Sequence, residues 1–187
     1  MTAPLIGFAG AARVGKDSAA QALLELGWKR RAFADKVRDM LYAMNPVLSE
    51  PNYKDGFTNV RHEVDYYGWD HVKDNYPEAR NYLQRLGTEG GRGVLGENVW
   101  VDALFRDSET WGPTVITDVR FPNEVRAIWD RGGIVVWIVR PGQTRSPESH
   151  HISENALKGW TLDDVILNDG SVQQLHDRVM QLIPLTV

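Results

Sequence analysis

Leu5-Ile6-Gly7-Phe8-Ala9-Gly10-Ala11-Ala12-Arg13-Val14-Gly15-Lys16-Asp17-Ser18 is the stretch that decides the fold of this chain of 187 residues. Its first five residues are a short apolar run, which predicts a buried strand. A loop bounded by Gly10 and Gly15 follows, and the run from Ala19 to Leu26 is rich in strong helix formers. The stretch therefore predicts a strand, a tight glycine loop and a helix in direct succession.

The loop has the pattern Gly-x-x-x-x-Gly-Lys, which between a strand and a helix is the P-loop motif. Glycine lets successive backbone N–H groups point inward, and the N-terminus of the helix adds its positive dipole end. Lys16 is then expected to reach the β- and γ-phosphates of a nucleotide. The plainer alternative is a glycine turn before a surface helix, with Lys16 solvated. The first interpretation predicts that a nucleotide contacts Ala12, Arg13, Val14, Gly15, Lys16, Asp17 and Ser18.

The metal ligand that accompanies such a loop is not decided by the sequence. Asp17 stands where the motif usually has Ser or Thr, and Ser18 follows it. A hydroxyl there normally binds Mg²⁺, so the ligand is Ser18, Asp17, or either one through water. Asp118 closes an apolar strand, where P-loop enzymes keep the acid that holds the magnesium shell. The alternative for Asp118 is an ordinary aspartate that caps the next helix.

Composition bounds the class of protein. The length suits one domain, residues 1–187, with 42% hydrophobic and 25% charged residues. The sequence has no apolar run of 18 residues and no basic segment before an apolar one, so we expect neither a membrane span nor a secretion signal. The absence of cysteine excludes disulfides and thiolate metal sites and fits a cytoplasmic protein. A net charge of −4 argues against general nucleic-acid affinity.

The apolar segments alternate between strand and helix patterns, which predicts a parallel sheet with helices on both faces. The further strands are expected at Trp28–Ala34, Thr114–Asp118, Ile134–Val139 and Asp164–Asn168. The further helices are expected at Lys36–Met44 with Asp35 as N-cap, Ala79–Gly90, Glu97–Phe105, Asn123–Arg131, and Val172–Leu182 with Ser171 as N-cap.

Two segments interrupt this alternation. Residues 46–80 have scattered prolines and glycines and no clean period, which predicts an inserted cap with helical pieces at Val60–Tyr66 and Trp69–Asn75. Residues 140–158 are polar and contain arginines, prolines and the adjacent His150 and His151, which predicts a lid. The two histidines have no cysteine beside them and do not favour a zinc site.

Ligands of parallel α/β sheets collect beyond the carboxyl ends of the strands. The expected strand ends place Asp35, Lys36, Asp118, Arg120, Arg140 and Asn168–Gly170 there. Arg120 and Glu124 are four residues apart, as either a surface salt bridge or a pair in which Glu124 orients Arg120 toward a substrate phosphate. Arg85 is a second phosphate-binding candidate, although a lone helical arginine fits an ordinary surface role equally well.

Seven short motifs follow one another along nearly the whole chain: Gly10–Ser18, Phe33–Asp35, Leu83–Glu89, Glu97–Trp100, Thr117–Glu124, His151–Glu154 and Asn168–Gly170. As a set they resemble the bacteriophage deoxynucleoside monophosphate kinases, within the nucleoside monophosphate kinase branch of P-loop proteins. The resemblance implies an α/β, three-layer P-loop NTPase fold. Its five-stranded parallel sheet would have the order 2-3-1-4-5, with helical cap and lid insertions.

The same resemblance implies ATP as the phosphoryl donor, Mg²⁺ as cofactor and a deoxynucleoside monophosphate as acceptor under the cap. It adds Arg140, Asn168 and Gly170 to the residues that contact ATP. It implies an acceptor site formed by Ala12, Asp35, Lys36, Arg85, Thr88, Trp100, Arg120, Glu124, His150 and Glu154. The catalytic residues would be Lys16, Arg85, Asp118 and Arg120, and the metal ligands Ser18, Asp17 and Asp118.

Other functions remain as alternatives. A different small-molecule P-loop kinase, such as a dephospho-coenzyme A kinase, would keep every phosphate contact and change only the acceptor. A GTPase would need an Asn-Lys-x-Asp stretch, which the sequence lacks. A non-catalytic nucleotide-binding regulator, or a DNA-packaging or repair ATPase, would bind or hydrolyse ATP without an acceptor. The sequence leaves open which bases are accepted, how ribose is excluded and whether the chain forms a homodimer.

Overall fold

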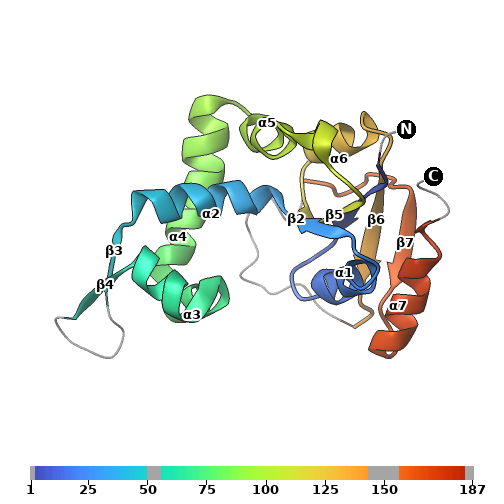
Figure 1. Ribbon diagram of the computed structural model, residues 1–187, viewed down its shortest axis with the longest axis horizontal. Coiled ribbons are helices and arrows are strands. Elements are labelled where there is room, and N and C mark those ends of the chain that lie inside the picture. The colour runs from blue at the N-terminus through green and yellow to red at the C-terminus, as the bar shows by residue number, and fades with distance from the viewer. Residues whose placement is uncertain (1–2, 50–55, 143–155, 184–187) are drawn as a thin grey trace. The chain divides into compact units, whose positions relative to one another are not determined.

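The computed structural model describes residues 3–49, 56–142 and 156–183 (Figure 1). The chain divides into two compact units. The core unit consists of Met1–Phe33 and Leu104–Val187, and the inserted unit consists of Ala34–Ala103. The expected cap, residues 46–80, lies wholly within the inserted unit, which is longer at both ends.

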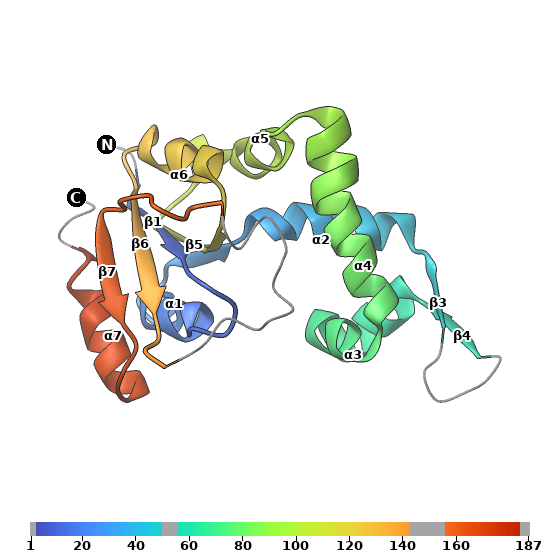
Figure 2. The same ribbon diagram turned by 180° about the vertical axis from the view of Figure 1, so that it is seen from behind.

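The core unit is built on a parallel sheet of five strands (Figures 1 and 2). Its strands are β1 (Leu5–Ala9), β2 (Lys29–Arg31), β5 (Thr114–Val119), β6 (Ile134–Val139) and β7 (Asp164–Leu167). They lie side by side in the order β2-β5-β1-β6-β7, and every neighbouring pair is parallel. Counted among these five strands alone, this is the predicted order 2-3-1-4-5. All five residues of the central β1 are buried, as its apolar sequence predicts.

Helices cover both faces of this sheet. On one face, α1 (Lys16–Leu24) and α7 (Val172–Met180) pack with Ile6 and Phe8 in a single hydrophobic cluster. The residue between them, Gly7, points to the other face, where α6 (Pro122–Trp129) lies. A Cβ atom on Gly7 would lie 2.6 Å from Cδ1 of Ile128 in α6, so a side chain here would push α6 away. The three-layer α/β prediction is therefore confirmed.

The region around β2 differs from the prediction. The expected strand Trp28–Ala34 is shortened to Lys29–Arg31, because α2 (Phe33–Met44) begins three residues before the expected Lys36. Asp118 explains the early start, since its Oδ1 accepts the N–H of Phe33 at 2.8 Å. Asp35 is therefore not the N-cap; it lies in the first turn, where it pairs with Arg38 at 2.8 Å.

The inserted unit contains a hairpin of β3 (Val47–Ser49) and β4 (Phe57–Asn59), followed by α3 (Val60–Asn75) and α4 (Pro77–Arg85). Gly68 has non-helical dihedral angles (φ 81°, ψ 168°) and divides α3, which confirms the two expected helical pieces on either side of it. The hairpin was not predicted, because strands of three residues are too short to show an alternating pattern. A cluster of buried residues holds the unit together: Leu41, Leu48, Val60, Val72, Tyr76 and Ala79.

The expected helix Ala79–Gly90 is also different. It ends as an α-helix at Arg85 and continues as a π-helix, η1 (Leu86–Leu95). The indole of Trp100, in α5 (Val99–Phe105), lies against Gly91, where a Cβ atom would collide with it. Its Nε1 donates to the Gly87 carbonyl at 2.8 Å. The glycine-rich sequence therefore accommodates a large aromatic ring at the cost of regular α-helical geometry.

The remaining elements agree with the sequence to within a few residues. A short 3₁₀ turn, η2 (Ser108–Thr110), links α5 to β5. Ser171 caps α7 as predicted, since its side chain accepts the N–H of Gln174. Within the ranges described above, no helix is both long enough and apolar enough to cross a membrane.

Candidate nucleotide-binding site

The loop between β1 and α1 is bent at three residues with positive φ: Gly10 (145°), Arg13 (63°) and Gly15 (98°). A Cβ atom at Gly10 would lie 2.5 Å from the carbonyl oxygen of Ile138, and one at Gly15 would lie 2.5 Å from Nδ2 of Asn168. Both glycines are therefore required by close approach of neighbouring elements as well as by backbone angle. The first residues of α1 follow directly, so the N-terminal end of this helix, with its N–H groups, adjoins the loop.

Lys16 is folded over this loop instead of extending into solvent. Its Nζ donates to the carbonyl oxygens of Gly10 at 3.0 Å and Ala11 at 2.7 Å. The positive charge is thereby held against the loop backbone. This is the position in which an ammonium group can meet a phosphate bound by the loop N–H groups.

A cavity of about 330 Å³, cavity A, opens on one side of the loop. Its lining joins the loop and the start of α1 to the segments that follow β6 and β7. It contains every residue predicted to contact ATP except Ala12 and Val14. The lining residues are Arg13, Gly15, Lys16, Asp17, Ser18, Arg140, Asn168, Gly170, Val172 and Leu175.

The turn after β7 is bonded directly to the loop. Nδ2 of Asn168 donates to the carbonyl oxygen of Val14 at 2.8 Å, and its backbone N–H donates to Val139 at 2.7 Å. Arg178 of α7 donates from one nitrogen to the carbonyl of Leu167 and, at 2.7 Å, to Oδ1 of Asp169. This hydrogen bond from Arg178 holds the pKa of Asp169 below its usual value.

A second cavity of about 270 Å³, cavity B, begins at the first residues of the same loop. Ala12 and Arg120, both predicted to contact the acceptor, belong to it. The sequence did not single out three further lining residues. Trp137 is in an apolar strand, Lys158 is the last residue of the expected lid, and Trp160 follows that lid. The lining residues are Gly10, Ala11, Ala12, Val119, Arg120, Trp137, Leu157, Lys158, Gly159 and Trp160.

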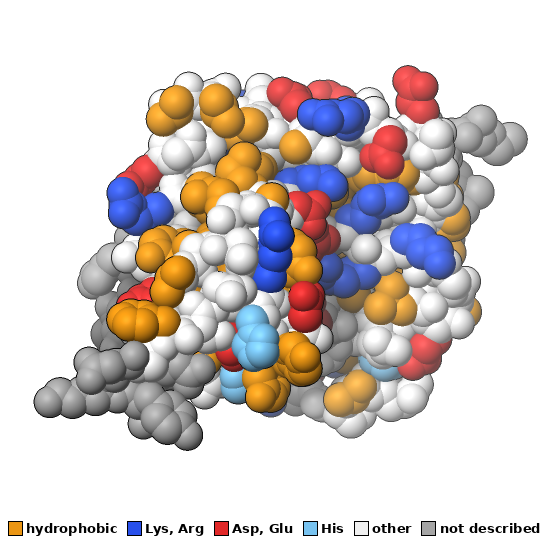
Figure 3. Space-filling model, turned by 60° about the vertical axis from the view of Figure 1, so that its left-hand side comes forward, with side chains coloured by type: hydrophobic (Ala, Val, Ile, Leu, Met, Phe, Trp, Pro, Cys, Tyr) orange, Lys and Arg blue, Asp and Glu red, His pale blue; other side chains and the backbone are white. Residues whose placement is uncertain are grey.

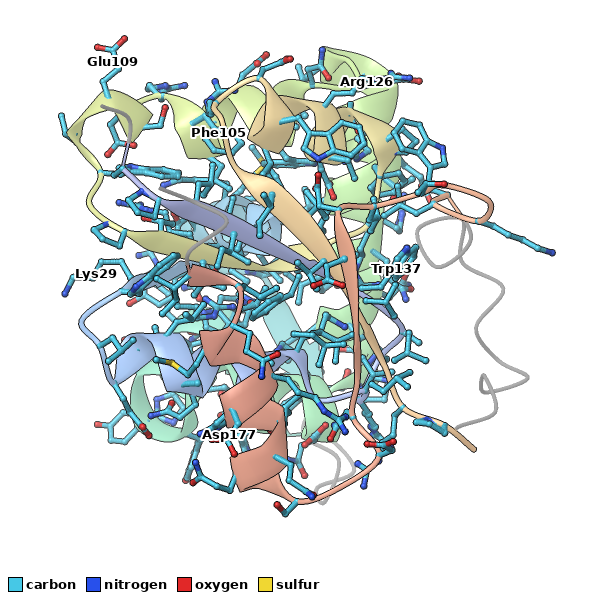
Figure 4. All side chains as sticks on the ribbon, turned by 90° about the vertical axis from the view of Figure 1, so that its right-hand side faces the viewer. Lys29, Phe105, Glu109, Arg126, Trp137 and Asp177 are labelled. Atoms are coloured by element: carbon cyan, nitrogen blue, oxygen red, sulfur yellow. The ribbon has the colours of Figure 1, made fainter. Side chains whose placement is uncertain are left out.

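The wall of cavity B that follows the expected lid is firmly packed. The ring of Trp160 stacks on Trp129 of α6 with centroids 6.2 Å apart, and the guanidinium of Arg126 lies 5.2 Å from its centre. Oδ2 of Asp163 accepts the indole N–H of Trp129 and the backbone N–H of Val135, both at 2.7 Å. Trp160 thus gives cavity B an aromatic side that is held by stacking on Trp129. Arg126 and Trp137 are labelled in Figure 4.

Glu124 organises the backbone that carries Arg120. Its Oε2 accepts the N–H groups of Arg120 at 2.7 Å and Phe121 at 3.1 Å, which closes a capping box at the start of α6. Glu124 is only 3% exposed, so the pair is not a plain surface salt bridge. Asp118, two residues earlier, uses Oδ1 to hold Phe33, as described above.

The other described residues that were predicted to contact the acceptor belong to the inserted unit. Within it, Lys36 pairs with Asp39 at 3.1 Å, and Arg85 is 63% exposed and pairs with Glu89 at 3.3 Å. Trp100 is 5% exposed, so inside this unit it is a packing residue. Thr88 lies in η1. Contact of these residues with an acceptor stays a prediction, and His150 and Glu154 lie outside the described residues.

The residues beside the loop fit a magnesium ion that arrives with its nucleotide. Among residues 3–49, 56–142 and 156–183, no group of three or more acidic, histidine or cysteine side chains is placed to hold a metal by itself. Mg²⁺ bound to ATP needs only one or two protein ligands, because phosphate oxygens and water supply the rest. Asp17 and Ser18 line cavity A and can supply them.

Known proteins resemble the chain in sequence. The protein ORF77 of Ictalurid herpesvirus 1 is 39% identical over 114 residues, which are 58% of this chain and 49% of that protein. The deoxynucleoside-5′-monophosphate kinase of Escherichia phage T5 is 27% identical over 141 residues, 72% of this chain and 54% of that protein. The chain therefore spans about half the length of these two relatives.

A solved structure, the dephospho-CoA kinase from Campylobacter jejuni, aligns with 98% of this chain and 97% of its own at 16% identity and a TM-score of 0.46. This likeness favours no particular acceptor. A family model described as deoxynucleotide monophosphate kinase matches residues 70–179, a range that includes Asp118, Arg120 and Asn168 but not the P-loop. Because this match covers more than half of the 187 residues, the chain belongs to the deoxynucleotide monophosphate kinase family.

Proposed function

We propose that this protein transfers the γ-phosphoryl group of ATP to the 5′-phosphate of a deoxynucleoside monophosphate, giving ADP and a deoxynucleoside diphosphate. The observation that carries the proposal is the position of Lys16. The residue lines cavity A, while its ammonium group is bonded to the carbonyls of Gly10 and Ala11, which line cavity B. A charge held between two cavities suits the transfer of a phosphoryl group from one to the other.

The donor would occupy cavity A. Its polyphosphate would lie on the N–H groups of the loop and the start of α1, where backbone dipoles favour negative charge. The adenosine would extend toward Arg140, Asn168 and Gly170, with Val172 and Leu175 as the apolar part of the lining. Ser18 and Asp17 would hold the magnesium ion, whose charge offsets part of the polyphosphate's negative charge.

The acceptor phosphate would lie in cavity B beside Arg120. Arginine binds a phosphate through two parallel hydrogen bonds, and Glu124 fixes the backbone from which this arginine extends. Lys158 adds a second positive charge to the same cavity. The residues of the inserted unit that the resemblance assigns to the acceptor, which are Asp35, Lys36, Arg85, Thr88 and Trp100, would contact its deoxyribose and base.

The reaction needs no general base. A phosphate monoester has its second pKa near about 6, so the attacking oxygen is already mostly ionised at pH 7. The obstacle is repulsion, since two unit charges about 4 Å apart repel by roughly 4 kcal/mol at an effective dielectric constant of 20. Lys16, Arg120 and the N–H groups of α1 would offset this repulsion most strongly when the two phosphates are closest.

Release of ADP measured with each ribo- and deoxynucleoside monophosphate in turn tests the proposal. We expect release in the presence of ATP and Mg²⁺ to depend on the acceptor and to be fastest with one or more deoxynucleotides. ADP release that is equal with and without every acceptor would contradict the proposal and would instead indicate an ATPase. ATP binding without any release would indicate a nucleotide-binding regulator.

Two alternatives are tested in the same assay. Dephospho-coenzyme A belongs in the acceptor panel, because a kinase for that substrate would use the same phosphate contacts. A DNA-dependent ATPase would respond to added DNA. On the face seen in Figure 3, acidic side chains are interspersed among the basic ones, in keeping with the net charge of −4.

A further inference from the structure

The contact between Asn168 and Val14 joins residues 154 positions apart, and Asn168 is one of the residues that line cavity A. The amide of Asn168 donates to the Val14 carbonyl at 2.8 Å in a partly buried setting. The same nitrogen lies so close to Gly15 that a Cβ atom there would be 2.5 Å from it. The Asn168 side chain therefore lies directly against the Val14–Gly15 peptide.

This contact determines which way the next N–H group points. The peptide bond is planar and trans, so the carbonyl of Val14 and the N–H of Gly15 point in opposite directions. With the carbonyl held by Asn168, the Gly15 N–H is turned away from Asn168. A P-loop binds phosphate through its inward-pointing N–H groups, so a rotation of this one peptide would remove a donor and present a carbonyl oxygen to the anion.

Asn168 is itself held in place by its neighbours. Its backbone N–H is bonded to Val139 at the end of β6, and the adjacent Asp169 is paired with Arg178 of α7. Arg178 also donates to Leu167, so one guanidinium group holds the turn on both sides of Asn168. The end of β6 and helix α7 thus hold the backbone of the turn that carries the Asn168 side chain.

We propose that Asn168 is a positioning residue, which with Asp169 and Arg178 forms a clasp that orients the Val14–Gly15 peptide for polyphosphate binding. The inference rests on the proposed function, because it assumes that the polyphosphate of ATP occupies the loop. It assigns Asn168 a role through the loop backbone, and that role does not depend on any contact with the adenine base.

Inorganic tripolyphosphate is the probe that separates these two roles, because it has the phosphates of ATP and no base. Calorimetric titration of wild type and Asn168→Ala with tripolyphosphate and with ATP measures both affinities. We expect the variant to bind both ligands about tenfold more weakly, since a lost hydrogen bond of this kind corresponds to about that factor. Gln173→Ala is the matched control, because this exposed amide bonds to Asp177 within its own helix, and it should bind as wild type does.

The outcome decides between the two roles. Unchanged tripolyphosphate affinity with weakened ATP affinity means that Asn168 contacts the nucleoside, and the clasp is overturned. Unchanged affinity for both ligands also overturns it. If wild type binds neither ligand, the proposed function fails, which is a different result from a failure of the clasp.

Asp169→Asn tests the clasp without a change at Asn168, because the clasp and simple electrostatics predict different changes in polyanion affinity. Removing a negative charge near cavity A should leave polyanion affinity unchanged or strengthen it if electrostatics alone matter. A loosened clasp predicts the reverse, about twofold to threefold weaker binding of tripolyphosphate. Tighter binding by this variant would overturn the proposal.

The amide resonance of Gly15 supplies a direct signature in protein labelled with ¹⁵N-glycine. We expect tripolyphosphate to shift this resonance strongly in wild type and much less in Asn168→Ala. An equal shift in both proteins, measured with the ligand at saturation, would show that the peptide keeps its orientation without Asn168 and would overturn the clasp.

Discussion

Gly15 combines two constraints that no other residue type satisfies. Its φ of 98° lies in the left-handed region, and its missing Cβ leaves room for Asn168. Gly27, at the end of the first helix, has a similar φ of 85°, but no atom lies within 4 Å of the place that a Cβ atom would take. Substitution of each glycine by alanine therefore distinguishes the effect of backbone strain alone from that of strain combined with steric collision.

Gly15→Ala should lose most of its ATP affinity, at least tenfold, because the new methyl group displaces Asn168 and the loop. Gly27→Ala should lose about 1 kcal/mol of unfolding free energy from strain in the left-handed region and keep its ATP affinity. Calorimetry with ATP and thermal unfolding measure the two effects. Equal ATP affinity in Gly15→Ala and wild type would contradict the loop geometry.

Asp118 has two candidate roles that a pair of variants distinguishes. One carboxylate oxygen accepts the Phe33 N–H, and an amide oxygen can do the same. Asp118→Asn should therefore unfold near the wild-type temperature but show a rate about 10- to 100-fold lower, if its charge serves the magnesium shell. Asp118→Ala should lose both properties. Full activity of Asp118→Asn across a magnesium titration would contradict the magnesium role and would show that Asp118 only caps α2.

At the scale of elements, two helices begin where a side-chain carboxylate accepts backbone N–H groups at the helix start or just before it. For α6 this carboxylate is Glu124, which accepts the N–H groups of Arg120 and Phe121. Glu124→Ala should lower the unfolding free energy by about 1–2 kcal/mol, or the melting temperature by about 2–8 °C. It should also reduce turnover by releasing Arg120, whereas Glu124→Gln should retain most of both properties. Equal stability of Glu124→Ala and wild type would contradict the capping role.

The Asp169–Arg178 pair should make the stability of the core unit depend on acid pH. The folded pKa of Asp169 is below its ordinary value of 3.8, so its contribution is present above that pH and is lost as the pH falls through the folded pKa. The difference in unfolding free energy between wild type and Asp169→Asn should therefore be constant near neutrality and shrink below about pH 3.8. High salt should reduce this difference, because the pair is exposed. A difference that grows on acidification would contradict the pairing.

Elements were predictable where their own residues determine them. β1 and β6 are continuous apolar runs, and their bounds match the prediction. The start of α2 could not be predicted, because its cap, Asp118, is 85 residues away from Phe33. The π-helix η1 was also missed, since its geometry depends on packing against Trp100 and not on a local pattern.

The residues of the site were likewise predictable where a local motif marks them and not where distant contacts determine them. Most of the residues that line cavity A were singled out in sequence by the P-loop motif and the strand ends, and their contact with ATP stays a prediction. Lys158 and Trp160 in cavity B were not predicted, because they lie at the end of the expected lid and just beyond it, and neither belongs to one of the seven motifs. The contact between Asn168 and Val14 was not predicted either, because it depends on the folded sheet, in which only β6 separates β7 from β1.

At the scale of the whole molecule, the core unit carries both cavities, and the inserted unit carries the remaining described residues that were predicted to contact the acceptor. The P-loop lies outside the range matched by the family model, so its geometry supports nucleotide binding independently of that match. Under the proposed function, the core unit would carry out phosphoryl transfer, and the inserted unit would be the proposed site of base selection.

Transfer of label from [γ-³²P]ATP tests the central claim most directly, with Lys16→Met and the exposed-surface control Lys29→Met measured beside wild type (Lys29 is labelled in Figure 4). We predict that wild type and Lys29→Met place the label on the β-phosphate of a deoxynucleoside diphosphate. Lys16→Met should do so at least about 100-fold more slowly, because a charge that stabilises the transferring group is lost. Label found only in inorganic phosphate, or equal transfer by Lys16→Met, would contradict the account.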